Sequence, residues 1–242
     1  MKVQGGRTHY GQAIGVLTLD TVFPRIVGDV GNAKSYDFPV KFKTVKRATV
    51  TRVLKGDKAL LLPFIEAAKE LEQEGVSAIT TSCGFLSPFQ KAIAKEVKVP
   101  VFTSTLMLLP LVHLMIGQNR KVGIITADSS SLTLGHFEGI GASDVPTVIE
   151  GLQNTKEFAS CFVKNGSSLD PEIAEKEVVE SAIRLVKKNP DVGAIVFECA
   201  NLAPYSEAVN RETGLPVFDI ITFIKMIHNA TVMSNRFGPK VL

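Results

Sequence analysis

The sequence has only three cysteines, Cys83, Cys161 and Cys199, and their spacings suit neither a disulfide framework nor a zinc-binding pair. The sequence also has no large excess of charge of one sign, because 27 basic and 24 acidic side chains leave a net charge of +3. This balance excludes a strongly basic nucleic-acid surface and an acidic tail. The histidines have no ligand spacing and no glycine-rich phosphate loop occurs, so we expect neither a metal site nor a nucleotide enzyme.

Long hydrophobic runs are scarce as well. The N-terminus has neither the apolar run nor the cleavage pattern of a signal peptide, so we expect a cytoplasmic protein. The most apolar stretch, Val101 to Gly117, contains Pro110 and His113 and is at the lower end of the length that crosses a bilayer. We therefore expect a buried or interface helix there, and no contact with a membrane.

The chain contains an internal repeat, which organises everything else. Residues 76–103 align with residues 192–219 without gaps, and eleven of the 28 aligned positions are identical. A second, weaker similarity joins residues 14–21 to residues 122–129 upstream of each copy. The two halves of the chain therefore begin alike and continue alike.

Each half reads as alternating strands and helices. Apolar runs such as 15–19 and 123–126 predict strands buried on both faces, and amphipathic patterns predict helices over 58–74 and 171–188. We predict two pseudosymmetric three-layer α/β/α domains with mainly parallel sheets and an active site in the cleft between them. The apolar stretch 220–233 has no counterpart and should pack back on the first half. The first domain is therefore expected to span 1–104 plus 220–242, and the second 105–219.

Two cysteines occupy matched places in this repeat, because Cys83 and Cys199 each follow a predicted strand. Ligands of parallel sheets bind at the carboxyl ends of the strands, so facing halves would set one thiol on each side of a ligand. The first N–H groups of the following helices would favour a carboxylate and lower a cysteine pKa towards the thiolate. These donors would be the backbone N–H groups of Gly84, Phe85, Ala200 and Asn201.

A plainer interpretation stays open for the same residues. A free cysteine commonly packs as a small buried hydrophobe, and duplication alone could retain a matched pair. Cys161 has no counterpart in the repeat, so we expect it in the core.

Four segments carry a resemblance to a known family: the strand ending Leu19-Asp20-Thr21, the turn 80–85, the strand 122–127 and the turn 197–201. Through them the sequence resembles the aspartate/glutamate racemase superfamily, which also includes hydantoin racemases, maleate isomerases and arylmalonate decarboxylases. The resemblance covers essentially the whole chain. It implies enzymes that use neither pyridoxal phosphate nor a metal, with the active site between two pseudosymmetric domains.

Two positions depart from the pattern of that superfamily. Gly84 stands where an asparagine usually follows the first cysteine, and Glu198 stands where a glycine usually precedes the second. The first change removes an expected contact to the substrate. The second places a carboxylate beside Cys199, which would tend to keep that thiol protonated if the two groups approach closely.

The resemblance implies that Cys83 and Cys199 are the two acid/base groups, one removing the proton from carbon α and the other delivering a proton to the opposite face. Thr21 and Thr126 are candidate hydroxyl donors to the substrate carboxylate. Asp20 could orient the first thiol or a substrate amine, or cap the next helix.

The loop 23–32 contains two glycines, a proline and Arg25, which could bind a distal carboxylate bidentately or remain a solvated charge. Taken together, these features predict a cofactor-independent racemase or epimerase that acts on an amino acid or related carboxylate. The alternatives are a single-cysteine isomerase or decarboxylase acting on a dicarboxylate, and a carboxylate-binding protein without turnover. We expect a homodimer or higher homo-oligomer.

Overall fold

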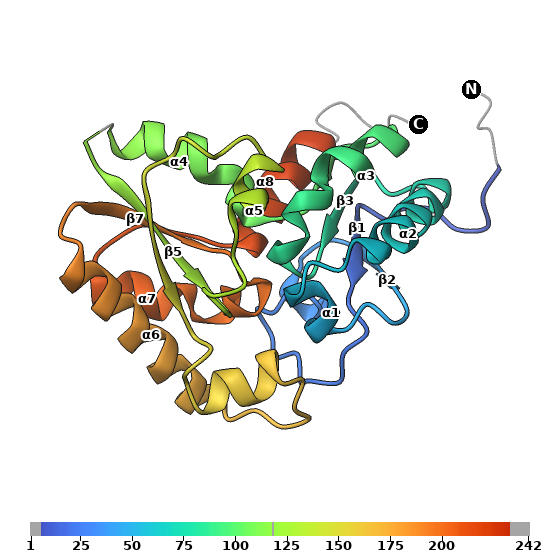
Figure 1. Cartoon of the computed structure of the whole chain (residues 1–242). Coiled ribbons are helices and arrows are strands. Elements are labelled where there is room, and N and C mark those ends of the chain that lie inside the picture. The colour runs from blue at the N-terminus through green and yellow to red at the C-terminus, as the bar shows by residue number, and fades with distance from the viewer. Residues whose placement is uncertain (1–5, 118, 233–242) are drawn as a thin grey trace.

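The computed structural model describes residues 6–117 and 119–232, and it contains two four-stranded parallel sheets (Figure 1). The strand order is β2-β1-β3-β4 in the first sheet and β6-β5-β7-β8 in the second. The strands are β1 (Ile14–Thr18), β2 (Val40–Thr44), β3 (Ala78–Thr81), β4 (Val101–Phe102), β5 (Lys121–Thr126), β6 (Thr147–Gly151), β7 (Val192–Phe197) and β8 (Val217–Phe218). All six strand pairs are parallel. The predicted repeat of two equivalent parallel sheets is thus confirmed.

Helices cover both faces of each sheet. The α-helices are α1 (Val50–Leu54), α2 (Leu61–Glu74), α3 (Gln90–Glu96), α4 (Leu109–Ile116), α5 (Leu134–Glu138), α6 (Pro171–Lys188), α7 (Ser206–Thr213) and α8 (Ile220–Thr231). Short 3-10 turns are η1 (Ala33–Ser35), η2 (Lys58–Leu60), η3 (Gly84–Phe89), η4 (Thr105–Leu108) and η6 (Ala200–Tyr205), and η5 (Ala159–Val163) is a π-helical turn.

The alternation of side chains along β1 explains the three layers of the first domain. Leu17 packs in one hydrophobic cluster with Phe64 of α2, whereas Val16 packs in a second cluster with Phe223 of α8. In the second domain α4 and α6 lie on opposite sides of β5 (Figure 1). All five residues of β1 are buried, as expected for a parallel strand covered on both faces.

One of the two predicted helices has the predicted ends in the structure, and the other does not. The helix over 171–188 is confirmed as α6, because the Asp170 side chain accepts hydrogen bonds from two backbone N–H groups of the first turn and Pro171 follows it. The helix predicted over 58–74 is instead the turn η2 followed by α2, since Asp57 caps a separate 3-10 turn. Gly75 ends α2 with a left-handed φ of 91°.

The C-terminal helix returns to the first domain. Phe223 of α8 lies 4.9 Å, centroid to centroid, from the ring of Phe102 in β4. Of the residues assigned to the first domain by the sequence, 1–5 and 233–242 lie outside the described residues, and so does the last residue of the predicted helix 220–233.

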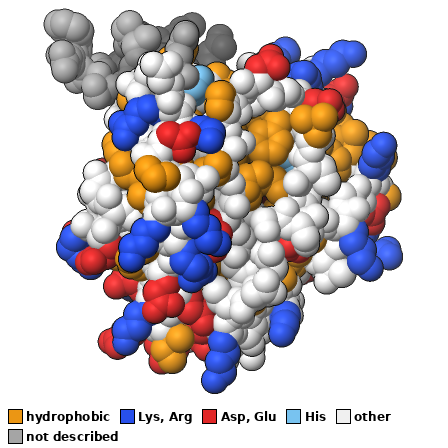
Figure 2. Space-filling model, turned by 60° about the vertical axis from the view of Figure 1, so that its left-hand side comes forward, with side chains coloured by type: hydrophobic (Ala, Val, Ile, Leu, Met, Phe, Trp, Pro, Cys, Tyr) orange, Lys and Arg blue, Asp and Glu red, His pale blue; other side chains and the backbone are white. Residues whose placement is uncertain are grey.

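The apolar stretch after β4 forms η4 and α4 and is only partly buried. Leu109 and Val112 of α4 are buried, whereas Leu114 and Met115 are exposed. In the described part of the chain, no helix combines the length and the hydropathy needed to cross a membrane. On the face seen in Figure 2, Lys and Arg side chains alternate with Asp and Glu side chains around a hydrophobic area.

Candidate active site

Cys83 and Cys199 line one cavity between the two domains. Cys83 lies between β3 and η3 as the N-cap residue of η3, and Cys199 lies between β7 and η6 as the N-cap residue of η6, so the repeat places the two thiols at equivalent turns. The cavity has a volume of about 30 Å³. The other residues around it are Leu19, Phe23, Val50, Val53, Leu54, Ser82, Phe85, Ala127, Phe162, Val163, Glu198 and Asn201.

Both thiols have raised pKa values, contrary to the prediction that helix N-termini would favour the thiolate. Burial, with the Glu198 carboxyl group as the second cause, raises the pKa of Cys83 to about 12. Burial also raises the pKa of Cys199 well above its ordinary value, with Glu198 and Cys83 adding to it. The Phe85 N–H group does lower the pKa of Cys83, and the Asn201 N–H group lowers that of Cys199. The dipoles therefore act in the predicted direction, but desolvation outweighs them.

Glu198 is the other ionisable side chain in the cavity, and only 1% of it is exposed. Thr126 Oγ1 donates a hydrogen bond to Glu198 Oε2 at 2.7 Å. Thr126 was predicted to donate its hydroxyl proton to the substrate carboxylate. In the structure it donates that proton to Glu198. Burial raises the pKa of Glu198 to about 8, and the hydrogen bond from Thr126 opposes part of that rise.

The two departures from the superfamily pattern occupy the same space. A Cβ atom at position 84 would overlap both the backbone oxygen and Oε1 of Glu198, and it would lie 3.0 Å from Ser104 Oγ. Gly84 is therefore required by the close approach of the turn that carries Glu198. The Glu198 carboxyl group of the second domain therefore occupies the space that a side chain at position 84 of the first domain would fill.

We expect the substitution Gly84→Ala to push the two cysteine turns apart. Overpacking of this kind costs roughly 1–3 kcal/mol of unfolding free energy, or about 2–12 °C in Tm for a chain of this size. Thermal denaturation measures the change. Gly135→Ala is the matched control, because a Cβ atom there meets only Thr133 Oγ1 at 3.7 Å. An unchanged Tm for Gly84→Ala would contradict the overlap.

A hydrogen-bonded chain leads from the loop 23–32 to the second thiol. Arg25 Nη1 donates to Asp29 Oδ1 at 2.7 Å, and Asn201 Nδ2 donates to Asp29 Oδ2 at 2.7 Å. Cys199 Sγ in turn donates to Asn201 Oδ1 at 3.6 Å. Arg25 thus holds a carboxylate of the protein, and its guanidinium carbon lies 4.7 Å from the Phe23 ring centroid.

Asp29 was missed by the sequence analysis, although it is 1% exposed. The signal available was its spacing of four residues from Arg25 in a loop singled out for its turn residues. Its Oδ1 atom also accepts a hydrogen bond from the Gly31 N–H group at 2.7 Å, so the loop is folded around this carboxylate.

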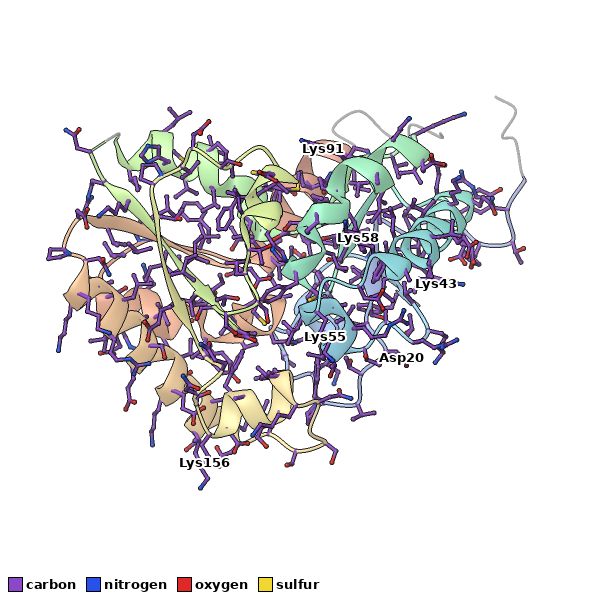
Figure 3. The ribbon with its side chains drawn as sticks, viewed as in Figure 1. Asp20, Lys43, Lys55, Lys58, Lys91 and Lys156 are labelled. Carbon is purple, nitrogen blue, oxygen red and sulfur yellow. The ribbon has the colours of Figure 1, made fainter. Side chains whose placement is uncertain are left out.

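Asp20 and Thr21 have partners within the protein. Asp20 Oδ2 accepts a hydrogen bond from the Arg47 N–H group at 3.0 Å, and its Oδ1 lies 3.7 Å from Lys46 Nζ. Figure 3 shows Asp20 at the side of the first domain, near the end of β2. Thr21 Oγ1 accepts from Arg25 Nη2 at 3.4 Å. Gly84, Phe85, Ala200 and Asn201 are the first residues of η3 and η6, beside the two cysteines.

Comparison with known proteins corrects the predicted reaction. The chain is 34% identical over 234 residues to a dimethylsulfoniopropionate lyase of Durusdinium sp. clade D, covering 93% of this chain and 77% of that protein. It is 32% identical over 237 residues to dimethylsulfoniopropionate lyase 7 of Emiliania huxleyi (strain CCMP1516), covering 93% and 69%. A lyase breaks a bond by elimination and does not invert a centre. The prediction of an amino-acid racemase, and of an isomerase in general, is therefore wrong.

The superfamily itself was predicted correctly. A structure of an arylmalonate decarboxylase variant with associated sulfate superposes on this chain with a TM-score of 0.64 at 18% identity, covering 92% of this chain and 94% of that one. That likeness shows the fold alone. The family model described as Asp/Glu/Hydantoin racemase matches residues 55–224. The chain therefore belongs to the Asp/Glu/hydantoin racemase family.

Proposed function

We propose that this chain is a lyase that acts on dimethylsulfoniopropionate and releases dimethyl sulfide and acrylate. The observation that carries the proposal is the likeness to the Durusdinium lyase over 93% of the chain at 34% identity. The convergence of two thiols on one cavity supports it, because an elimination begins when a base removes a proton next to the carboxylate.

The cavity is lined by two chemically different kinds of group, which suit the two ends of a zwitterion. Phe23, Phe85 and Phe162 supply aromatic rings. Aromatic faces attract cations within about 6 Å of the ring centroid, so these rings suit the sulfonium group. Cys83, Cys199 and Asn201 also line the cavity, beside the first N–H groups of η3 and η6, which favour a carboxylate.

The proposed step needs a single base. The thiolate forms an S–H bond with the proton at the carbon next to the carboxylate, and the C–H electron pair becomes the C=C bond. The bond from the β carbon to the sulfonium sulfur breaks, and its electron pair leaves on neutral dimethyl sulfide. Because the leaving group is neutral, no acid has to protonate it. The proton taken up by the thiolate is finally released to solvent.

Cys83 is the better candidate for that base. The S–H group of Cys199 donates to Asn201 Oδ1 at 3.6 Å, which holds the proton on that sulfur, and the neighbouring Cys83 adds to burial and Glu198 in raising the pKa of Cys199. A positive charge entering the cavity lowers the pKa of a nearby thiol. The sulfonium group of the substrate therefore favours formation of the thiolate that removes the proton from the carbon next to the carboxylate.

The cavity has to widen to admit this substrate, since its 30 Å³ is far below the roughly 300–1,000 Å³ of small-molecule sites. A neighbouring cavity of about 390 Å³ lies against α1, η3 and α5 and shares Val53 and Phe85 with it. Because both cavities touch these two side chains, their movement is the change we expect to widen the site.

The test is to incubate the purified protein with dimethylsulfoniopropionate and to quantify dimethyl sulfide by gas chromatography and acrylate by proton NMR. We expect equal amounts of the two products. The uncharged analogue 3-(methylthio)propionate should not react, because it lacks the sulfonium charge. Failure of the folded protein to release dimethyl sulfide would refute the proposal.

A further inference from the structure

One polar atom of a cavity-lining residue has no hydrogen-bond partner in the described chain. It is Oε1 of Glu198, which is buried, while Oε2 of the same carboxyl group accepts from Thr126 at 2.7 Å. Glu198 lines the cavity together with Cys83 and Cys199. Because buried polar atoms are nearly always paired, an unpaired oxygen on a cavity-lining residue indicates a partner that binds there.

The charge state of Glu198 decides which partner that is. Within residues 6–117 and 119–232, no Lys, Arg or His side chain forms an ion pair with it. Burial raises its pKa to about 8, so the carboxyl group is mostly protonated at neutral pH. Since Oε2 accepts from Thr126, the proton belongs on Oε1, which then needs an acceptor.

We infer that Glu198, as a neutral acid, donates a hydrogen bond from Oε1 to the carboxylate of the substrate and stabilises the negative charge that develops on it. The inference rests on the proposed lyase function. As the proton leaves the adjacent carbon, the substrate carboxylate gains enolate character and becomes a stronger acceptor, so the hydrogen bond strengthens in the transition state. The proton stays on Glu198 throughout, and the acrylate carboxylate is its acceptor at the end of the step.

The position of Glu198 favours the carboxylate over the sulfonium group. Its Oε1 atom lies against Gly84, the residue that follows the Cys83 thiol in the chain, so a group bound to Oε1 lies close to the proposed base. An ionised Glu198 would repel a carboxylate in that place. The second domain thus supplies the donor that a side chain at position 84 would otherwise supply from the first.

Two titratable groups line the cavity beside Glu198, and two more lie beyond Asn201. The thiols of Cys83 and Cys199 face it in the cavity, and both have pKa values above its own. Behind Asn201 lie Asp29 and Arg25, which form an ion pair with each other. On raising the pH, Glu198 therefore ionises before either thiol.

The variants E198Q and E198A test the donor role through the pH dependence of lyase activity. Glutamine presents an amide N–H group in place of the acid, so kcat/KM at pH 7 should stay within about tenfold of wild type, whereas alanine should lose roughly 100-fold or more. Above pH 8, the ratio of kcat/KM for E198Q to that of wild type should rise, because only the wild-type donor ionises. Equal losses in E198Q and E198A, or a ratio independent of pH, would overturn the inference.

Binding of propionate, measured by isothermal titration calorimetry, separates this inference from the proposed reaction. Between pH 6.5 and pH 9 the wild-type affinity should fall about tenfold, as the protonated fraction of a group with a pKa of about 8 falls. The affinity of E198Q should not change. This pattern in a protein without lyase activity would overturn only the proposed function. Undetectable binding to wild type, or an equal fall in both proteins, would overturn the role of Glu198.

Discussion

Replacing Cys83 with serine should lower kcat/KM for dimethylsulfoniopropionate by roughly 1,000-fold or more, because a positioned general base contributes about 10²–10⁴ to a rate. A hydroxyl group is a far weaker acid than a thiol and supplies almost no anion at neutral pH. The same change at Cys199 should cost only about tenfold, the scale of one altered hydrogen bond. Initial rates of dimethyl sulfide release measure both effects.

We expect a larger loss of kcat/KM at Cys83 than at Cys199 because the leaving group is neutral. A racemase needs a base on one face and an acid on the other, so both thiols would move protons. Departure of a neutral sulfide requires only the base. In the proposed reaction Cys199, whose S–H group donates to Asn201 Oδ1 at 3.6 Å, is therefore expected to line the cavity and to transfer no proton.

The control is Cys161→Ala, which removes the third thiol. Cys161 is buried in η5 and does not line the cavity, so its loss should leave kcat/KM nearly unchanged. Equal large losses at Cys83 and Cys199 would mean that both thiols take part in bond breaking. A larger loss at Cys199 would reverse the roles assigned here. Circular dichroism of each variant distinguishes these effects from unfolding.

The fold was predictable because both copies of the repeat indicate the same order of strands and helices. A constant offset over residues 76–103 and 192–219 requires two equivalent halves, and the cysteines at one aligned position had to occupy equivalent turns. Helix ends were predictable only where the sequence marks them, as Asp170-Pro171 does for α6. The break between η2 and α2 was not, since the apolar pattern continues through it.

The electrostatics of the site were not predictable in the same way. The pKa of Cys83 depends on how deeply residues distant in the sequence bury its sulfur, and that depth has no local signal. Thr126 and Glu198 are 72 residues apart, so nothing in either segment indicates that they meet. The helix N-termini were visible in the sequence, but the larger effect of desolvation was not.

The reaction could not be predicted from the two thiols alone. A racemase and a lyase of this kind both start by removing a proton next to a carboxylate, and they need the same base and similar donors. They differ in whether the substrate carries a leaving group on the next carbon. Phe23, Phe85 and Phe162, which we propose to contact the sulfonium group, are scattered along the chain and form no motif.

Replacing Asp29 with alanine should destabilise the protein by about 3–5 kcal/mol, because it leaves the charge of Arg25 without its buried partner. The Arg25 side chain is only 15% exposed, so water cannot fully replace the carboxylate. The corresponding fall in Tm is roughly 6–20 °C. Activity should fall as well, since Asn201 loses the acceptor that orients it towards Cys199. Thermal denaturation and lyase rates measure the two effects.

Asp20→Ala is the matched control, because Asp20 is an aspartate of the same region whose contacts are at the surface. Its side chain is 38% exposed and 3.7 Å from Lys46 Nζ, and exposed pairs contribute only about 0–1 kcal/mol. Removing both charges, in Arg25→Leu combined with Asp29→Leu, should cost less stability than Asp29→Ala, since no unpaired charge remains buried. If Asp29→Ala lost no more stability than Asp20→Ala, the loop would not depend on its ion pair. The orientation of Asn201 beside the second thiol would then have to come from the packing of η6 alone.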